Sequence, residues 1–125
     1  MKPLALVIED DIHISEFFCF VLEDAEYKTQ SAIDGQTALA RLRVNTPDLI
    51  FLDLNLPDIS GQEILQFIRE DDRLKSTRVV IITGYGKAID AKLEMNADFV
   101  LTKPVEYAQV HHLARRLQPT PQQST

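Results

Sequence analysis

Five polar residues follow short apolar segments of the chain, and their types could support chemistry on phosphate. Asp53 follows the apolar run "LIFL" (49 to 52), and Glu9 and Asp10 follow "LALVI" (4 to 8). Thr83 follows "VVII" (79 to 82), and Lys103 comes shortly after "FVL" (99 to 101). Three carboxylates, a hydroxyl and an ammonium at one place would hold a hard cation and phosphoryl oxygens, with one carboxylate as the nucleophile.

The apolar runs predict the strands that would position these residues. All four are short and continuous, and they are mostly rich in β-branched or aromatic residues, which is typical of strands buried on both faces of a parallel sheet. A fifth and more polar segment, "YKTQSA" (27 to 32), suits an edge strand. Stretches of helical period separate these segments, so the chain is expected to alternate strands and helices.

Capping residues and apolar spacing predict the first three helices. Asp34 is expected to cap the second helix, which Asn45 and Pro47 then close. Ser60 and Glu63 predict a capping box at the start of the third helix, which leaves Asp53 free for another role. The first helix is expected to present one broad apolar face, formed by Ile14, Phe17, Phe18, Val21, Leu22 and Ala25.

Two further helices and a tail complete the predicted architecture. The fourth helix is expected over Lys87 to Met95, with Asn96 ending it in the left-handed conformation, and the last over Pro104 to about Leu117. Five strand and helix units predict a three-layer (βα)5 flavodoxin-like α/β fold with a parallel sheet of order 2-1-3-4-5. We expect one domain over 1–118 and a flexible tail or linker stump over 119–125.

The composition is that of an ordinary globular domain. Hydrophobic residues make up 45% and charged residues 26% of the 125 residues, and Cys19 is the only cysteine. A single thiol cannot form an internal disulfide, which suits a reducing compartment. The formal net charge of -6 argues against nucleic-acid binding by this chain, and the sequence has neither a secretory signal nor a membrane-spanning run. We therefore expect a cytoplasmic protein.

The predicted strand order brings the acidic residues to one edge of the sheet. The first and third strands are neighbours in this order, and such sheets bind ligands outside the carboxyl ends of these strands. Glu9, Asp10 and Asp53 should therefore converge, and because unpaired carboxylates raise one another's pKa, they require a cation. Oxygen-only ligation with few protein donors suits Mg2+. Taken alone, each residue is more often a turn or surface residue, but their coincidence at strand ends favours a site.

Four motifs, taken in order, identify a resemblance to a known family: "VIEDD", "FLDLNLPDISG", "VVIITG" and "ADFVLTKP". From Leu4 to about Leu117 the chain resembles a response regulator receiver domain of two-component signalling, in the CheY-like superfamily. The resemblance implies that Asp53 accepts a phosphoryl group from a sensor histidine kinase or a phosphotransfer protein. It also implies that Glu9 and Asp10 bind Mg2+.

The resemblance implies roles for the remaining residues of the expected site. Asp53 and the backbone carbonyl of Asn55 would be further ligands of the Mg2+ ion. Thr83 and Lys103 would contact the phosphoryl oxygens. The peptide bond between Lys103 and Pro104 would be cis, as in the family, and such bonds are rare enough elsewhere to indicate a positioning device.

Two positions affect the expected mechanism of output. Receivers usually carry Tyr or Phe three residues before the lysine, and here that residue is Val100, so the usual aromatic rotamer switch is absent. The stretch from Thr83 to Lys103 is also somewhat short for the family, which suggests an unusual partner face. Tyr85 follows Thr83 by two residues and has two open interpretations: its ring limits the attack of water on the phosphoryl group, or it is an exposed loop residue.

The leading hypothesis is a phosphoacceptor switch and not an enzyme, with only self-phosphorylation from small donors and self-dephosphorylation. Modification of Asp53 would change the face formed by the fourth helix, fifth strand and fifth helix, and so the affinity for a downstream protein. The chain is expected to be a monomer or a weak dimer, acting alone or as part of a larger regulator or hybrid kinase.

Two alternatives remain open at this stage. A hydrolase of the haloacid-dehalogenase kind also forms an aspartyl phosphate, but it needs a second carboxylate two residues after the nucleophile, where this chain has Asn55. A receiver-shaped interaction module that no longer uses phosphorylation is favoured by Val100 and opposed by the complete set of acids, Thr and Lys.

Overall fold

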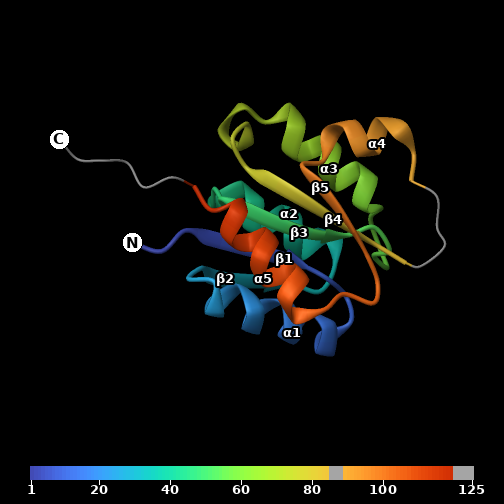
Figure 1. Cartoon of the computed structure of the whole chain (residues 1–125). Helices are drawn as coiled ribbons and strands as arrows, with labels where there is room; N and C mark the ends of the chain where they lie inside the picture. Colours follow the sequence, from blue (N-terminus) through green and yellow to red (C-terminus); the bar gives the residue numbers. More distant parts are fainter. Residues whose placement is uncertain (85–88, 120–125) are drawn as a thin grey trace.

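Five parallel strands form a single sheet at the centre of the molecule (Figure 1). The computed structural model describes residues 1–84 and 89–119. The strand order is β2-β1-β3-β4-β5, so the predicted order and the three-layer flavodoxin-like fold are confirmed. The strands are β1 (Leu4–Ile8), β2 (Lys28–Ala32), β3 (Leu49–Asp53), β4 (Arg78–Thr83) and β5 (Phe99–Thr102).

Helices cover both faces of this sheet, as Figure 1 shows. Their bounds are α1 (Ile12–Asp24), α2 (Gly35–Val44), α3 (Gly61–Glu70), α4 (Ala91–Asn96) and α5 (Tyr107–Arg116), with a short 3-10 helix at Asp72–Leu74. One core cluster joins the sheet to α1 and α5, and a second joins it to α2, α3 and α4. In the described part of the chain, no helix has both the length and the apolar character needed to cross a membrane.

The register of the central strands determines which polar residues meet at the carboxyl edge. All five residues of β3 are buried, in agreement with a strand covered on both faces. Ile8 pairs with Leu52, so Glu9 leaves β1 beside the end of β3. Asp53 pairs with Ile82, so Thr83 ends β4 one step further along. The edge strand β2 is more polar and less buried, as predicted.

Short polar side chains define the starts of α2 and α3, and apolar spacing defines the buried face of α1. The Asp34 carboxylate accepts a hydrogen bond from the backbone N–H of Thr37, which confirms its predicted role as the cap of α2. The Ser60 hydroxyl accepts one from the N–H of Glu63 and so caps α3, which is one half of the predicted capping box; the hydrogen bonds of the described residues do not include the reciprocal bond to the Glu63 side chain. On α1, the predicted apolar face packs into the core through Phe18, Val21 and other members.

The last two helices end within one residue of the predicted positions, but they start later than predicted. Within the described residues, α4 begins at Ala91, because the Asp90 carboxylate accepts from the N–H of Lys92 and caps the first turn. The predicted beginning at Lys87 lies outside the described residues. Asn96 does not adopt the left-handed conformation: it is the last helical residue, and Ala97 continues in an extended conformation. The last helix starts at Tyr107 instead of Pro104, because Glu106 caps it.

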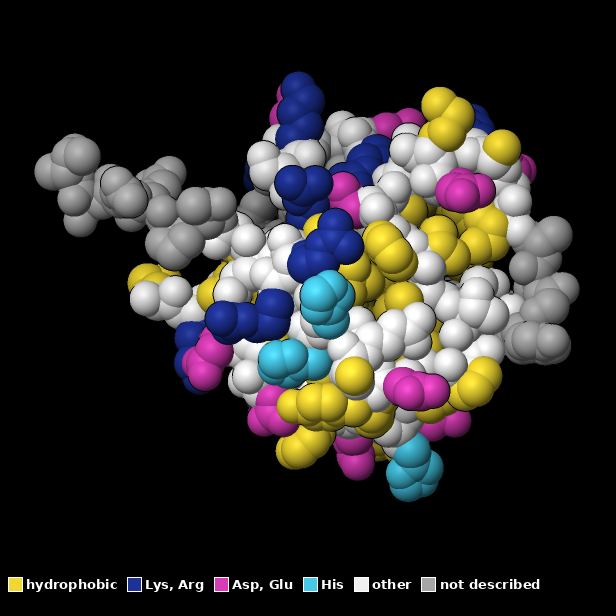
Figure 2. Space-filling view, viewed as in Figure 1, with side chains coloured by type: hydrophobic (Ala, Val, Ile, Leu, Met, Phe, Trp, Pro, Cys, Tyr) yellow, Lys and Arg dark blue, Asp and Glu magenta, His cyan; other side chains and the backbone are white. Residues whose placement is uncertain are grey.

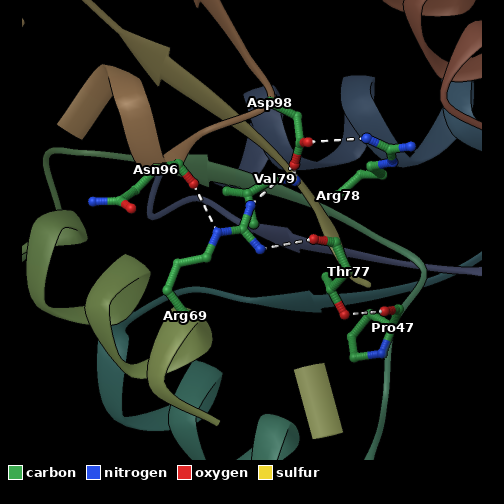
Figure 3. Close-up of polar contacts among 7 residues, drawn as sticks. All are labelled: Pro47, Arg69, Thr77, Arg78, Val79, Asn96 and Asp98. Atoms are coloured by element: carbon green, nitrogen blue, oxygen red, sulfur yellow. Dashed lines mark hydrogen bonds and ion pairs between the residues drawn. The ribbon is translucent and has the colours of Figure 1, made fainter. Parts of the chain in front are cut away.

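A polar network at the opposite edge of the sheet joins α3, α4 and the starts of two strands (Figure 3). The guanidinium of Arg69 donates to the carbonyls of Asn96 and Thr77, at 2.7 and 3.0 Å, and to the Asp98 carboxylate at 3.0 Å. Asp98 also accepts from the Val79 N–H at 2.7 Å. Arg69 therefore ties the end of α3 to the end of α4 and to the chain entering β4 and β5.

Replacing Arg69 with Met should lower the free energy of unfolding by about 2 kcal/mol, because three acceptors lose a charged donor. Urea denaturation monitored by circular dichroism measures this loss. Arg78→Met is the matched control, since the Arg78 side chain is 57% exposed and forms one ion pair with Asp98. That variant should lose less than about 1 kcal/mol. Equal losses in the two variants would contradict the role assigned to Arg69.

Candidate functional site

Asp53 ends β3 at the carboxyl edge of the sheet and is only 3% exposed. One carboxylate oxygen, Oδ1, accepts a hydrogen bond from the N–H of Asn55 at 2.8 Å. The other, Oδ2, accepts from the Lys103 ammonium at 2.8 Å. A buried carboxylate requires such partners, because an unpaired charge in the interior is costly. The side chain is therefore held by its own turn and by the residue that follows β5.

Glu9 leaves β1 beside Asp53 and is 1% exposed. Its Oε2 accepts from the N–H of Asp11 at 3.2 Å, and its Oε1 lies 3.0 Å from the Lys103 ammonium. Burial of the Glu9 carboxyl, together with the neighbouring Asp53 carboxyl, raises its pKa to about 7. Burial lowers the pKa of Lys103, but its hydrogen bonds to Asp53 and Glu9 outweigh this effect and raise it. One ammonium thus bridges two buried carboxyl groups.

The three acidic residues predicted to converge do so. One carboxylate oxygen from each of Glu9, Asp10 and Asp53 lies within 4.8 Å of the others. Asp10 is exposed, so the cluster opens to solvent on its side. Three carboxylates beside one ammonium have an excess of negative charge, and their oxygen donors are of the kind that Mg2+ prefers. The donor set therefore fits a hard divalent cation.

Thr83 and Lys103 are brought to the same edge by the pairing of β4 with β5. Thr83 is buried and pairs with Thr102, and its carbonyl accepts from the N–H of Lys103 at 2.8 Å. The peptide bond between Lys103 and Pro104 is cis, as the resemblance implied. The backbone of Lys103 is thus fixed to the end of β4, and its side chain reaches across to β3.

The remaining predicted residues lie in different settings. Asn55 is exposed in the segment between β3 and α3, where its N–H is bound to Asp53. Val100 is half-buried and packs against the core cluster on the α2, α3 and α4 side of the sheet. Tyr85 lies outside the described residues.

Two acidic residues that support the site were not predicted. Asp11 caps α1, since its Oδ1 accepts from the N–H groups of His13 and Ile14 at 2.9 and 3.1 Å. Its position just before a helical apolar pattern was a usable signal. Asp58 accepts from the N–H groups of Gly35 and Gln36 at 2.7 and 3.0 Å. Because that contact joins distant parts of the chain, no local sequence pattern predicts it.

Comparisons with known proteins agree with this arrangement. The family model described as the response regulator receiver domain matches residues 5–115. The DNA-binding dual master transcriptional regulator RpaA of Synechocystis sp. is 37% identical over 126 residues, covering 96% of this chain and 52% of RpaA. The phosphate regulon transcriptional regulatory protein PhoB of Escherichia coli is 34% identical, covering 95% and 55%. The chain spans about half the length of these relatives.

Solved structures show the same fold. The response regulator receiver domain (CheY-like) of Methylobacillus flagellatus has a TM-score of 0.86 and 26% identity, covering 94% of this chain and all of that one. The chemotaxis response regulator CheY4 of Vibrio cholerae has a TM-score of 0.85 and 25% identity, covering 94% and 99%. Because the family model spans most of the chain and the sheet carries the expected groups at its carboxyl edge, this chain belongs to the response regulator receiver domain family of two-component systems.

Proposed function

We propose that this chain is a phosphoacceptor switch, in which Asp53 accepts a phosphoryl group from a sensor histidine kinase or a phosphotransfer protein in a Mg2+-dependent reaction. The observation that carries the proposal is the Lys103 ammonium, which lies 2.8 Å from Asp53 and 3.0 Å from Glu9. A cation beside a buried carboxylate is the arrangement required for a nucleophile that must receive further negative charge. Membership of the receiver family supports this class of function.

The residues around Asp53 have separate roles in the proposed transfer. An Asp53 carboxylate oxygen forms a bond to phosphorus as the bond from phosphorus to the donor histidine nitrogen breaks. Lys103 stays protonated, since its pKa is raised, and its ammonium attracts the phosphoryl oxygens. The Thr83 hydroxyl, at the end of the neighbouring strand, donates a hydrogen bond to one of these oxygens.

Oxygen donors at the same edge would hold the metal ion. We assign them to the carboxylates of Glu9, Asp10 and Asp53 and to the backbone carbonyl of Asn55. When bound, Mg2+ supplies positive charge that stabilises the phosphoryl oxygens during transfer. The excess of carboxylates over ammonium groups supports this assignment, because a cluster of acids without a compensating cation is unfavourable.

In the proposed chemistry each chain is modified once, at Asp53, as in a signalling domain. This chemistry includes self-phosphorylation from small donors and self-dephosphorylation, and no separate substrate. A hydrolase of the haloacid-dehalogenase kind would need an acid two residues after Asp53, and the carboxamide of Asn55 cannot exchange a proton in that role. The buried pairing of Asp53 with Lys103 also argues against an interaction module that has lost the reaction.

Output is proposed to pass through the face formed by α4, β5 and α5 to a downstream protein. Met95 on α4 is 85% exposed and Phe99 on β5 is 43% exposed, so apolar side chains are available to a partner. Figure 2 shows hydrophobic side chains at the surface over α4. Position 100 carries a half-buried Val, so the aromatic rotamer switch that is usual in the family has no counterpart there. The proposed protein is a cytoplasmic monomer or weak dimer.

Treatment with acetyl phosphate and Mg2+ should add one phosphoryl group to the natural chain, as measured by intact mass. Asp53→Asn should abolish the addition, because the amide is a poor nucleophile. Asp72→Asn is the matched control and should be modified normally, since the Asp72 side chain is 95% exposed outside the site. Modification of the Asp53→Asn variant at an unchanged rate, or continuous hydrolysis of the donor without a modified protein, would exclude the proposal.

Mg2+ should bind about tenfold more tightly at pH 8 than at pH 6, because a Glu9 carboxyl with a pKa of about 7 must lose its proton to become a ligand. Isothermal titration calorimetry at the two pH values measures the change. The Glu9→Gln variant should bind Mg2+ more weakly, and its affinity should no longer change with the protonation of residue 9. A natural chain with the same affinity at both pH values would contradict the assignment of Glu9.

The same titration should affect stability in the absence of Mg2+. The raised pKa of Glu9 means that the folded protein binds this proton more tightly than the unfolded chain, so its contribution to stability falls as the pH rises from 4.5 to about 7. Glu9→Gln should therefore raise the melting temperature more at pH 8 than at pH 5. Glu16→Gln, at an exposed position of α1, serves as the control.

A further inference from the structure

The segment between β3 and α3 carries Asn55, whose carbonyl is assigned above to the metal ion. At its start, the N–H of Leu54 donates to the carbonyl of Ile82 at 3.2 Å, and the N–H of Asn55 donates to Asp53. At its end, the N–H of Gly61 donates to the carbonyl of Leu54 at 3.3 Å. These bonds close the segment on itself, but they do not determine how residues 55–60 lie against the rest of the molecule.

Asp58 supplies the connection to another element. Its Oδ1 accepts from the N–H of Gly35 at 2.7 Å and its Oδ2 from the N–H of Gln36 at 3.0 Å, both in the first turn of α2. Among the described residues, these are the only hydrogen bonds that join residues 55–60 to an element other than β3 and α3. Hydrogen bonds from Gly35 and Gln36 lower the pKa of Asp58, so its carboxylate is the species that accepts them.

Close packing accompanies these two hydrogen bonds. A Cβ atom at Gly35 would lie 2.6 Å from the Cβ of Ile59, which is shorter than any normal contact, so the backbone of α2 meets the segment directly. Ile59 also packs against the core cluster beneath α2 and α3. At the other end, a Cβ at Gly61 would lie 2.7 Å from the Cα of Leu54. The part of the segment next to α3 is therefore packed closely against α2 and against Leu54, and Asn55 lies between Leu54 and this part.

We propose that Asp58 is a positioning residue for the metal site, which holds the segment between β3 and α3 against α2 and so fixes the Asn55 carbonyl where a cation can bind it. The inference rests on the proposed function, because it concerns the same Mg2+ site. Asp58 is not proposed to touch the ion or the phosphoryl group. Its effect passes through three residues of backbone, from Asp58 to Asn55.

The role of Asp58 predicts a specific pattern of effects. Asp58→Ala removes both bonds to α2 but leaves Glu9, Asp53 and Lys103 in their places. Affinity for Mg2+ should therefore fall by about tenfold, within the loss typical of groups that orient metal ligands. The rate of modification by acetyl phosphate should fall at low Mg2+ and recover at saturating Mg2+, because the nucleophile is intact.

Calorimetric titration of the full chain with Mg2+ at pH 8 tests the inference. Asp58→Asn should bind Mg2+ with intermediate affinity, since its side-chain carbonyl can still accept from the Gly35 N–H. Asp34→Ala and Ser60→Ala are the matched controls. Each removes a helix-capping bond, between Asp34 and Thr37 at the start of α2 or between Ser60, the last residue of the segment, and Glu63 of α3, without removing the bonds of Asp58. Melting temperatures without Mg2+ record the loss of stability in every variant.

Three outcomes are distinguishable. Weak Mg2+ binding by Asp58→Ala, with near-natural binding by both controls at a similar loss of melting temperature, supports the inference. If the natural chain and Asp58→Ala bind Mg2+ equally, or if a control loses as much affinity, the role of Asp58 is wrong while the proposed function stands. If the natural chain does not bind Mg2+, the proposed function fails and the role of Asp58 fails with it.

Discussion

The structure depends on an electrostatic constraint at the carboxyl edge of the sheet. Asp53 and Glu9 are almost fully buried, and one ammonium, that of Lys103, lies within 3.0 Å of both. Burial of the Glu9 carboxyl raises its pKa, and the neighbouring Asp53 carboxyl adds to this effect. Asp10 adds a third carboxylate at the opening. The site therefore carries an excess of negative charge, and its oxygen donors are of the kind that could hold a divalent cation.

A parallel sheet makes this constraint possible. Residues far apart in sequence meet because parallel strands end at the same edge of the sheet. The register of β1 with β3 and of β4 with β5 determines which of these residues lie side by side. The interior of the sheet is apolar on both faces, so it cannot relax to separate the charges. The cost of the charged edge is offset by two core clusters and by the Arg69 network at the opposite edge.

Acidic residues near this edge divide into two kinds by their partners. Glu9, Asp10 and Asp53 lie close together, and the Lys103 ammonium contacts two of them, so the excess of negative charge suits them to bind a cation. Asp11, Asp34 and Asp58 accept backbone N–H groups at helix starts, which favours a carboxylate there. Neighbouring residues such as Asp10 and Asp11 therefore have different roles, and the difference depends on which amides each side chain reaches.

The sequence by itself determined the strands, their order and the residues at their ends, because apolar runs and chain order specify a parallel sheet and its carboxyl edge. It also identified the family, through motifs that contain Asp53, Thr83 and Lys103. The starts of α4 and α5 were wrong, since Asp90 and Glu106 cap these helices and the apolar pattern does not reveal where capping occurs. Only the tertiary structure decided the contacts of Arg69 and Asp58. These side chains bind backbone groups of elements distant in sequence, and neither apolar spacing nor a local motif predicts such contacts.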